Sequence, residues 1–357
     1  MSKAQSLLRA YPWLEAPVIV SAPMRVLSGA KLAVAVTRAG GLGFIGPGAD
    51  PSSTATELQS AKELLEEASF AASRPAAKAL PVGVGFQTWN GSLASATAAI
   101  EKYHPSAAWL FAPRRGQAEL DEWTRGIRQA SPQTQIWIQV GTLREAVDAV
   151  KSQHAPDVLV VQGAEAGGHG RATDGMGLFS LLPEVVDAVR DSPIPVMAAG
   201  GIVDGRGVIA ALGLGASGVV MGTRFLASSE ARISKGYQNA ILASNDGAVS
   251  TTRTQLYNHL RGTFDWPEQF SPRTIINQSW RDHEAGVAFE ELKKRHDEAV
   301  AQGDKAWGEE GRTATYAGAS IGLIHDVKDA GAVVQDVRKE VSEIASSLQS
   351  HYGSESL

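Results

Sequence analysis

The fold is decided by the stretch from Ile194 to Phe225, which reads IPVMAAGGIVDGRGVIAALGLGASGVVMGTRF. Two short apolar runs in it, Pro195–Ala199 and Gly218–Met221, have the length and composition of buried parallel strands. Between them the spacing predicts a helix over Gly205–Leu212, capped by Asp204. A strand, a helix and a second strand in this order form one unit of a parallel α/β sheet.

The same alternation extends over most of the chain upstream of this stretch. Six more runs have the pattern of buried strands: Val18–Ala22, Leu42–Ile45, Pro81–Phe86, Ala107–Phe111, Gln135–Val140 and Val158–Val161. Helical patterns lie between them: Ala30–Arg38, Thr54–Ser73, Ser92–Lys102, Gln117–Gln129, Leu143–Ser152 and Leu181–Arg190. Eight parallel strands with intervening helices predict an α/β fold of the (β/α)8 TIM barrel type. The alternative, a doubly wound sheet, rarely needs eight strands in unbroken alternation.

The pattern changes after the eighth strand. Residues 227–307 contain no convincing strand, three tryptophans and, over Ala285–Ala301, helical spacing. We interpret residues 227–312 as a mainly helical insertion that lies over the mouth of the barrel. The barrel is then formed by residues 1–226 and 313–357, and it closes with an amphipathic helix over Ala332–Leu348.

Composition and charge exclude several classes of function. The chain has 357 residues, a net charge of −5 and no basic block, so nucleic acid is not an expected partner. It has no cysteine, which excludes disulfides, thiolate metal sites and cysteine nucleophiles. No apolar run approaches the ~20 residues of a membrane span, and the amino terminus lacks the apolar core of a signal peptide. We expect a cytoplasmic protein with no membrane partner, either a monomer or a homodimer.

The two strand ends in the opening stretch carry the residues of a phosphate site. Gly200 and Gly201 end the seventh strand, and Gly222 and Thr223 end the eighth. The last two strand–loop units of a barrel often bind phosphate through backbone N–H groups and a nearby helix N-terminus. The alternative is that these glycines only make short turns. Two consecutive strand ends of this kind favour the phosphate site.

A second glycine-rich loop follows the sixth strand and reads QGAEAGGHG over residues 162–170. Its glycines, Gly163, Gly167 and Gly168 among them, allow the backbone to come close to a flat ligand, and Gln162 adds a side-chain amide. His169 is a titratable side chain on this loop, which is how a barrel enzyme presents a base to a planar cofactor. A tight turn with an incidental surface histidine is the alternative.

The other strand ends complete the mouth of the predicted barrel. Strand one brings Ala22, Pro23 and Met24, and strand five brings Gln139. The mouth therefore combines backbone donors for a phosphate, amide side chains for the edge of a ring and one good base. It has no paired carboxylates for glycoside hydrolysis and no clustered metal ligands, so no metal site is expected. A phosphorylated redox ring such as FMN is the cofactor that these parts suit.

The motifs QGAEAGGHG, AAGGI followed by MGTRF, the opening SAPM and the late AGASIGL resemble those of the nitronate monooxygenase family, once called 2-nitropropane dioxygenases. The resemblance implies an FMN-bearing (β/α)8 barrel that oxidises alkyl nitronates, and sometimes nitroalkanes, with O2 to a carbonyl compound and nitrite. It also implies that His169 is the active-site base. The FMN contacts that it implies are Ala22, Pro23, Met24, Gln162, Gly168, Gly201, Gly222 and Thr223. Two departures, Ala319 in place of a frequent glutamine and the segment FQTWN, bear on the size of the substrate.

The implied chemistry needs only one imidazole. Forming a nitronate means removing the acidic proton next to a nitro group, which a histidine that titrates near neutrality can do. A substrate supplied as the nitronate does not need that step. His169 would then orient the anion or balance its charge, and the sequence leaves both roles open.

Other functions also stay open at this point. A flavin-dependent enoyl-thioester reductase has a barrel with a similar AGGH loop and would consume a nicotinamide donor. A catalytically silent flavin-binding barrel would bind the cofactor without consuming O2. An aldolase-like barrel ranks last, because none of the predicted strand ends carries a lysine.

Overall fold

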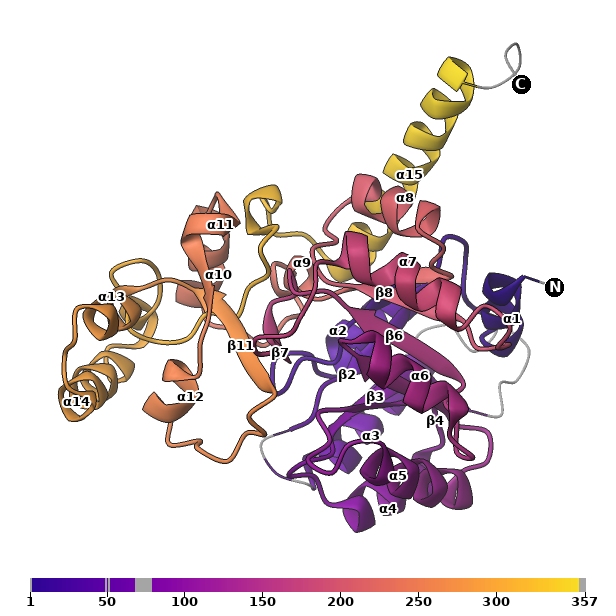
Figure 1. Ribbon diagram of the computed structural model, residues 1–357, viewed down its shortest axis with the longest axis horizontal. Coiled ribbons are helices and arrows are strands. Elements are labelled where there is room, and N and C mark those ends of the chain that lie inside the picture. Colours follow the sequence, from indigo (N-terminus) through magenta and orange to yellow (C-terminus); the bar gives the residue numbers. More distant parts are fainter. Residues whose placement is uncertain (1, 49, 51, 68–78, 353–357) are drawn as a thin grey trace.

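The computed structural model describes residues 2–48, 50, 52–67 and 79–352. Among them lies a closed barrel of parallel strands in the order β1-β2-β3-β4-β5-β6-β8-β9 (Figure 1). The strands are β1 (Ile19–Ser21), β2 (Leu42–Ile45), β3 (Leu80–Gln87), β4 (Pro105–Phe111), β5 (Gln135–Val140), β6 (Val158–Gln162), β8 (Val196–Ala199) and β9 (Gly218–Met221). The barrel closes where β1 pairs with β9, with Ile19 opposite Val219. The predicted (β/α)8 fold is confirmed, with every expected strand in place.

Helices alternate with the strands and cover the outside of the barrel. They are α2 (Ala30–Arg38), α3 (Ser53–Glu67), α4 (Leu93–Tyr103), α5 (Gln117–Ala130), α6 (Leu143–Lys151), α7 (Leu178–Ala188) and α8 (Gly205–Gly213). Asp204 caps α8 as predicted, accepting from the N–H groups of Arg206 and Gly207. The predicted end of the helix after β2, residues 68–73, lies outside the described residues. Helix α7 begins three residues earlier than predicted, because the Glu165 carboxylate accepts from the Leu178 N–H at 2.9 Å.

Aromatic side chains fill the interior of the barrel from its amino-terminal end inward. Phe44 on β2, Trp109 on β4 and Trp137 on β5 pack with ring centroids 5.2 to 6.0 Å apart. The Trp137 indole donates to the Tyr11 hydroxyl at 2.7 Å, just after helix α1 (Lys3–Ala10). Because this end is packed, space for a ligand remains at the carboxyl ends of the strands, where barrel enzymes have their sites.

The closing helix, α15 (Ala330–Tyr352), is longer than the predicted 332–348. Its first half buries Val333, Val334, Val337 and Val341 beside α2 and α8. The second half extends beyond the rest of the molecule in Figure 1. In the described part of the chain, no helix combines the length and apolarity needed to cross a membrane.

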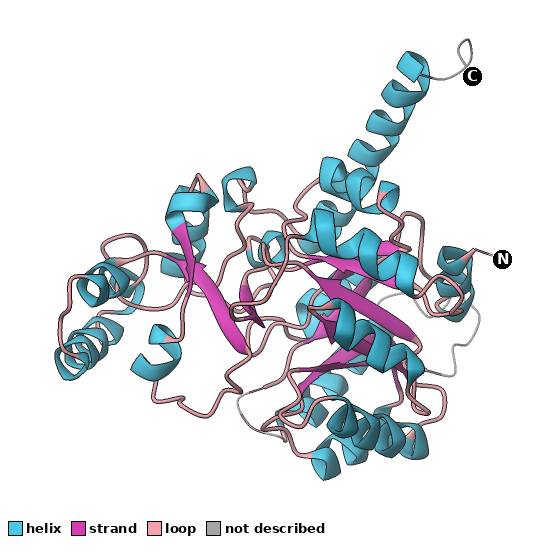
Figure 2. Ribbon diagram, in the orientation of Figure 1, coloured by secondary structure: helices cyan, strands magenta, loops and turns pink. Residues whose placement is uncertain are grey.

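The segment after β9 contains strands, so the expectation of none over residues 227–307 is wrong. Strands β10 (Thr251–Arg253) and β11 (Phe270–Ile275) join β7 (Gly168–Arg171) in an antiparallel sheet of order β10-β11-β7 (Figure 2). Both are short, polar for strands, and β11 contains Pro272. Strand β11 is extended because it pairs with the glycine-rich loop about 100 residues upstream, with Ser271 opposite Gly170, and β10 pairs with the other edge of β11. Such non-local pairing leaves no periodic signal in the sequence.

Helices make up most of the remaining insertion. They are α10 (Lys235–Ala243), α11 (Gly247–Ser250), α12 (Leu256–Leu260), α13 (Gln278–Glu284), α14 (Phe289–Val300) and the 3-10 turn Gly303–Ala306. In Figure 1 they lie beside the β7–β11 pair, on the far side from the barrel helices. The expected helix over 285–301 is present as α14, which covers 289–300, and α13 ends at Glu284, just before the expected start. The division into units at residues 1–226 with 313–357 and at 227–312 stays a prediction.

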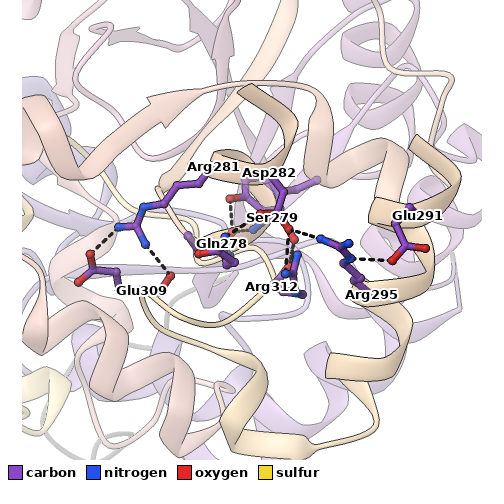
Figure 3. A network of polar contacts seen from close by, with 10 residues as sticks. Gln278, Ser279, Arg281, Asp282, Glu291, Arg295, Glu309 and Arg312 are labelled. Atoms are coloured by element: carbon purple, nitrogen blue, oxygen red, sulfur yellow. Dashed lines mark hydrogen bonds and ion pairs between the residues drawn. The ribbon is translucent and has the colours of Figure 1, made fainter. Parts of the chain in front are cut away.

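A network around Asp282 connects the outer helices of the insertion (Figure 3). The Asp282 carboxylate on α13 lies 2.9 Å from Arg295 of α14 and 2.8 Å from Arg312, and it accepts from Gln278 at 2.6 Å. Burial alone would raise the pKa of Asp282, but the bonds from Gln278, Arg312 and Arg295 outweigh it and leave that pKa below 3.8. The folded state therefore favours the ionised carboxylate.

We expect Asp282→Asn to reduce the free energy of unfolding near neutral pH by about 1 kcal/mol, a modest value because solvent screens the network. A carboxylate whose pKa is lowered on folding stabilises the protein above its unfolded pKa and loses that effect as pH falls through the folded pKa. The loss should therefore be smaller at about pH 3 than near neutral pH. Urea titrations at both pH values measure this. Glu309→Gln, which breaks the exposed pair with Arg281, is the control, and an equal loss at both pH values would contradict the prediction.

Candidate active site

A cavity of about 670 Å³ opens at the carboxyl ends of the barrel strands, a size typical of cofactor sites. Twelve of the thirteen predicted site residues line it: Ala22, Pro23, Met24, Gln139, Gln162, Gly167, Gly168, His169, Gly200, Gly201, Gly222 and Thr223. The structure therefore brings together residues from five strand ends that lie up to 200 residues apart in the chain.

Gly163 is the predicted residue that does not line the cavity. Its N–H donates to the Ala199 carbonyl at 2.9 Å. A Cβ at this position would lie 2.3 Å from the Glu165 carboxylate and 2.7 Å from the Leu178 nitrogen. The position needs glycine so that the loop can pack against the start of α7, and it offers nothing to a ligand in the cavity.

The ends of β8 and β9 form a cradle of backbone. Gly200 and Gly201 have φ values of +105° and +72°, which side chains rarely allow. Gly222 precedes the short helix α9 (Thr223–Leu226), and a Cβ there would meet nothing closer than 3.8 Å, so it would project into the cavity. Among the described residues, the N–H groups of Gly201 and Thr223 have no hydrogen-bonded partner. Unpaired N–H groups around open space suit a phosphate.

Arg253 on β10 holds the glycine-rich loop in shape. Its guanidinium donates to the carbonyls of Ala164 at 3.2 Å, Ala166 at 3.0 Å and Gly168 at 3.2 Å, and also to Ser271 of β11. Burial and the neighbouring Arg273 lower the pKa of Arg253 to about 10, so the group stays charged at neutral pH. Nothing in the run TTR marks this arginine as functional, because its partners are backbone atoms remote in sequence.

The late segment AGASIGL packs against the same loop. The Ala319 N–H donates to the Glu165 carbonyl at 2.8 Å, and the Gly318 N–H donates to the Thr223 hydroxyl at 3.0 Å. A Cβ on Gly167 would lie 2.5 Å from the backbone of Gly318. The segment therefore fixes the loop in addition to Arg253 and links it to the strand end at Thr223.

His169 lines the cavity and is held by the insertion. Its ring stacks on Trp266, with centroids 3.6 Å apart and planes 12° from parallel, and Trp266 in turn packs against Trp89 at 4.8 Å. Its Nε2 lies 3.0 Å from the side-chain nitrogen of Asn258 on α12. Burial and the positive charges of Arg261 and Arg253 lower the pKa of His169 well below 6.5. The expectation of a histidine that titrates near neutrality is not met, and His169 is neutral at pH 7.

Sequence reasoning missed Asn258, Arg261, Trp266 and Tyr316 as cavity residues or as contacts of His169. Arg261, Trp266 and Tyr316 line the cavity, and Arg261 donates to the Tyr316 hydroxyl. Asn258, Arg261 and Trp266 lie in insertion segments without a recognisable motif, where the three tryptophans, Trp266 among them, were the available signal. Tyr316 directly precedes the motif AGASIGL, which could have pointed to it.

The charged side chains of the described cavity lining are all positive. Arg25, Arg232 and Arg261 line it, and no aspartate or glutamate is found among the described lining residues. Arg232 is paired with Glu57 at 2.6 and 2.7 Å, outside the lining. Across the ranges that the structure describes, no group of histidine, aspartate and glutamate side chains could hold a metal ion. The cavity is thus built for anionic ligands.

Comparison with known proteins extends this picture. The model of the nitronate monooxygenase family matches residues 127–339, more than half of the chain. Nitronate monooxygenase npaC of Metarhizium robertsii is 59% identical over 348 residues, which are 97% of each chain. A nitronate monooxygenase of Neurospora crassa is 36% identical over 95% of this chain and 93% of its own.

Two solved structures have the same fold. FabK from Thermotoga maritima aligns with a TM-score of 0.73 and 24% identity over 97% of this chain and 98% of its own. Nitroalkane oxidase from Streptomyces ansochromogenes aligns with a TM-score of 0.72 and 24% identity over 96% and 99%. At such identities these two likenesses concern the fold alone.

The similarity to nitronate monooxygenases spans barrel and insertion alike, and it confirms the resemblance found in the motifs. It implies an oxidoreductase with a flavin cofactor. The chain belongs to the nitronate monooxygenase family.

Proposed function

We propose that the chain binds FMN in the strand-end cavity and uses O2 to oxidise alkyl nitronates to carbonyl compounds and nitrite. The observation that carries the proposal is the cavity itself, whose lining combines three arginines, no described carboxylate and a glycine cradle at β8 and β9. A flavin phosphate and a nitronate are both anions, so both suit this lining.

The phosphate of FMN would lie against Gly201, Gly222 and Thr223. Their N–H groups and the open space over Gly222 support this placement. FAD would need room for a second nucleotide half, whereas a monophosphate ends at the cradle. We therefore propose FMN as the flavin.

The ring of the flavin would lie against Ala22, Pro23, Met24 and the two glutamines. The Gln139 oxygen accepts from the Trp109 indole at 3.1 Å, which leaves the Gln139 amide nitrogen as the donor available to a ligand. The Gln162 side-chain nitrogen donates to the His169 carbonyl at 3.3 Å, so the Gln162 side-chain oxygen is the atom available to a ligand as an acceptor. When bound, the flavin supplies the redox chemistry that connects the nitronate to O2.

We propose that His169 is the catalytic residue that contacts the nitronate. It lies on the loop that borders the cavity, and its ring is fixed by Trp266. A pKa well below 6.5 makes it a weak base, which favours the anionic nitronate over the neutral nitroalkane as substrate. The cytoplasmic location and the monomeric or homodimeric state stay predictions from the sequence.

Heat-released cofactor from the purified protein should co-elute with FMN in chromatography. The purified protein should consume O2 and release nitrite when it is given ethylnitronate. FAD, or no flavin after reconstitution, would contradict the cofactor assignment. If the protein consumes NADPH with a crotonyl thioester and consumes no O2 with ethylnitronate, the result would support the enoyl-thioester reductase instead. A yellow protein inactive in both assays would be a silent flavin-binding barrel.

Gly222→Val should leave the fold intact and abolish FMN retention. The valine side chain meets no protein atom closer than 3.8 Å at its Cβ, and it would occupy the space that the phosphate needs. The ratio of flavin to protein absorbance after gel filtration measures the effect. Gly213→Val, at the exposed end of α8 where a Cβ also meets nothing within 4 Å, is the matched control. Full flavin occupancy in Gly222→Val would mean that this loop is only a turn.

His169→Leu should retain FMN and lower kcat/KM for ethylnitronate by roughly 10²-fold, the usual cost of removing one preorganised contact to a reacting anion. Oxygen uptake and the flavin spectrum measure the two effects separately. His259→Leu is the control, since His259 stacks on Phe264 and does not line the cavity. Unchanged turnover in His169→Leu would make this histidine a structural residue.

A further inference from the structure

We propose that Asn258 is a positioning residue that keeps the proton of His169 on Nδ1, so that the imidazole offers the cavity an N–H donor and no basic lone pair. The inference deepens the proposed function, on which it depends only for the identity of the ligand. It follows from a chain of hydrogen bonds in the insertion. At each end of this chain, the partner group allows only one orientation of the neighbouring side-chain amide.

The first end is a backbone carbonyl. The Gln255 side-chain nitrogen donates to the Phe270 carbonyl oxygen on β11. A carbonyl oxygen can only accept, so the Gln255 amide cannot be turned the other way. The Gln255 oxygen must therefore face Asn258, where it accepts from the Asn258 nitrogen at 2.6 Å.

The second end is a guanidinium. Arg261 lies 3.4 Å from the Asn258 oxygen, and a guanidinium can only donate. Both neighbours thus require the same orientation of the Asn258 amide, with the oxygen toward Arg261 and the nitrogen toward Gln255. Asn258 is fully buried on α12, so solvent cannot replace either partner.

The same amide nitrogen reaches His169. It lies 3.0 Å from Nε2. Because a side-chain amide nitrogen can only donate, Asn258 donates this hydrogen bond and Nε2 accepts it. An accepting Nε2 is unprotonated, so a neutral His169 must carry its one proton on Nδ1. Protonating Nε2 would set two N–H groups against each other. Burial beside Arg261 and Arg253 keeps the pKa of His169 low and is consistent with this neutral state.

Nδ1 is the ring nitrogen that a ligand can reach. His169 lines the cavity, and Nε2 is the ring nitrogen with a hydrogen bond among the described residues. His169 is partly exposed, and among the described residues no hydrogen-bond partner is found for Nδ1, so Nδ1 is the nitrogen left for a ligand. The stack on Trp266 fixes the plane of the ring, and with it the direction of the Nδ1–H bond.

This tautomer suits a preformed nitronate. An Nδ1–H group donates to a nitronate oxygen, where the negative charge lies. It has no lone pair with which to take the proton next to a nitro group, so a neutral nitroalkane finds no base at His169. The sequence left open whether His169 removes a proton or orients an anion, and the hydrogen-bond chain favours orientation.

The direct test is the tautomer in the wild-type, flavin-loaded protein. Labelling the histidine rings with 15N separates protonated from unprotonated nitrogens, and His169→Asn identifies the signals of His169 among those of the eight histidines. We expect a protonated Nδ1 and an unprotonated Nε2 near neutral pH. A protonated Nε2 would overturn the proposal, whatever the enzyme oxidises.

Asn258→Asp should reverse the tautomer. The isosteric carboxylate can only accept, so it draws the proton to Nε2 and leaves a lone pair on Nδ1. We expect kcat/KM for ethylnitronate to fall roughly 10²-fold or more, as a misplaced imidazole proton does elsewhere. The ratio of kcat/KM for nitroethane to that for ethylnitronate should rise. A purely structural role would lower both activities together, and an unchanged tautomer would contradict the assignment.

Asn277→Asp is the matched control. Asn277 is also buried in the insertion, where it bonds Tyr257 at 2.6 Å and Thr313 at 2.9 Å without contacting His169. It should leave the His169 ring signals unchanged. Failure of the proposed function would be seen separately, as an absence of O2 uptake by wild-type protein with ethylnitronate.

Discussion

The site depends on the contact between the Arg253 guanidinium and the carbonyls of the glycine-rich loop. A loop with so many glycines has high conformational entropy when free. Arg253 removes that freedom by donating to Ala164, Ala166, Gly168 and Ser271. Charge-assisted bonds of this kind, made in a largely buried setting, are among the stronger ones available to a backbone. The same side chain thus shapes the loop and attaches the insertion to the barrel.

The antiparallel sheet carries this attachment to His169. With β7 paired to β11, Pro272 lies opposite His169, and the segment between β10 and β11 brings Asn258 and Trp266 to its ring. The barrel alone would supply the flavin cradle and the histidine but neither of the groups that orient the histidine. The insertion therefore orients the histidine of a cavity whose glycine cradle is built by the barrel.

Local features of the sequence predicted what depends on local structure. The eight strands, the cap at Asp204 and the cradle at Gly201 and Gly222 follow from apolar runs, capping residues and glycines at strand ends. Features that depend on distant partners were missed. Strand β11 exists through pairing with β7 and β10 through pairing with β11. Gly163 is required by the carboxylate of Glu165, and the insertion supplies Arg253 and Arg261 near the buried His169.

The electrostatics of the cavity explain why a neutral histidine is compatible with an anionic substrate. Arg25 and Arg261 supply positive charge near His169, and burial together with this charge keeps the imidazole from becoming cationic. In the proposed function, attracting the anion and orienting it are thereby assigned to different groups, with arginines for the long-range attraction and a single directed N–H for the contact. An imidazolium would do both less selectively, since it would attract any anion and would have to lose its bond from Asn258. A buried, uncharged donor with a fixed direction distinguishes one anion from another by geometry, which an excess of positive charge cannot do.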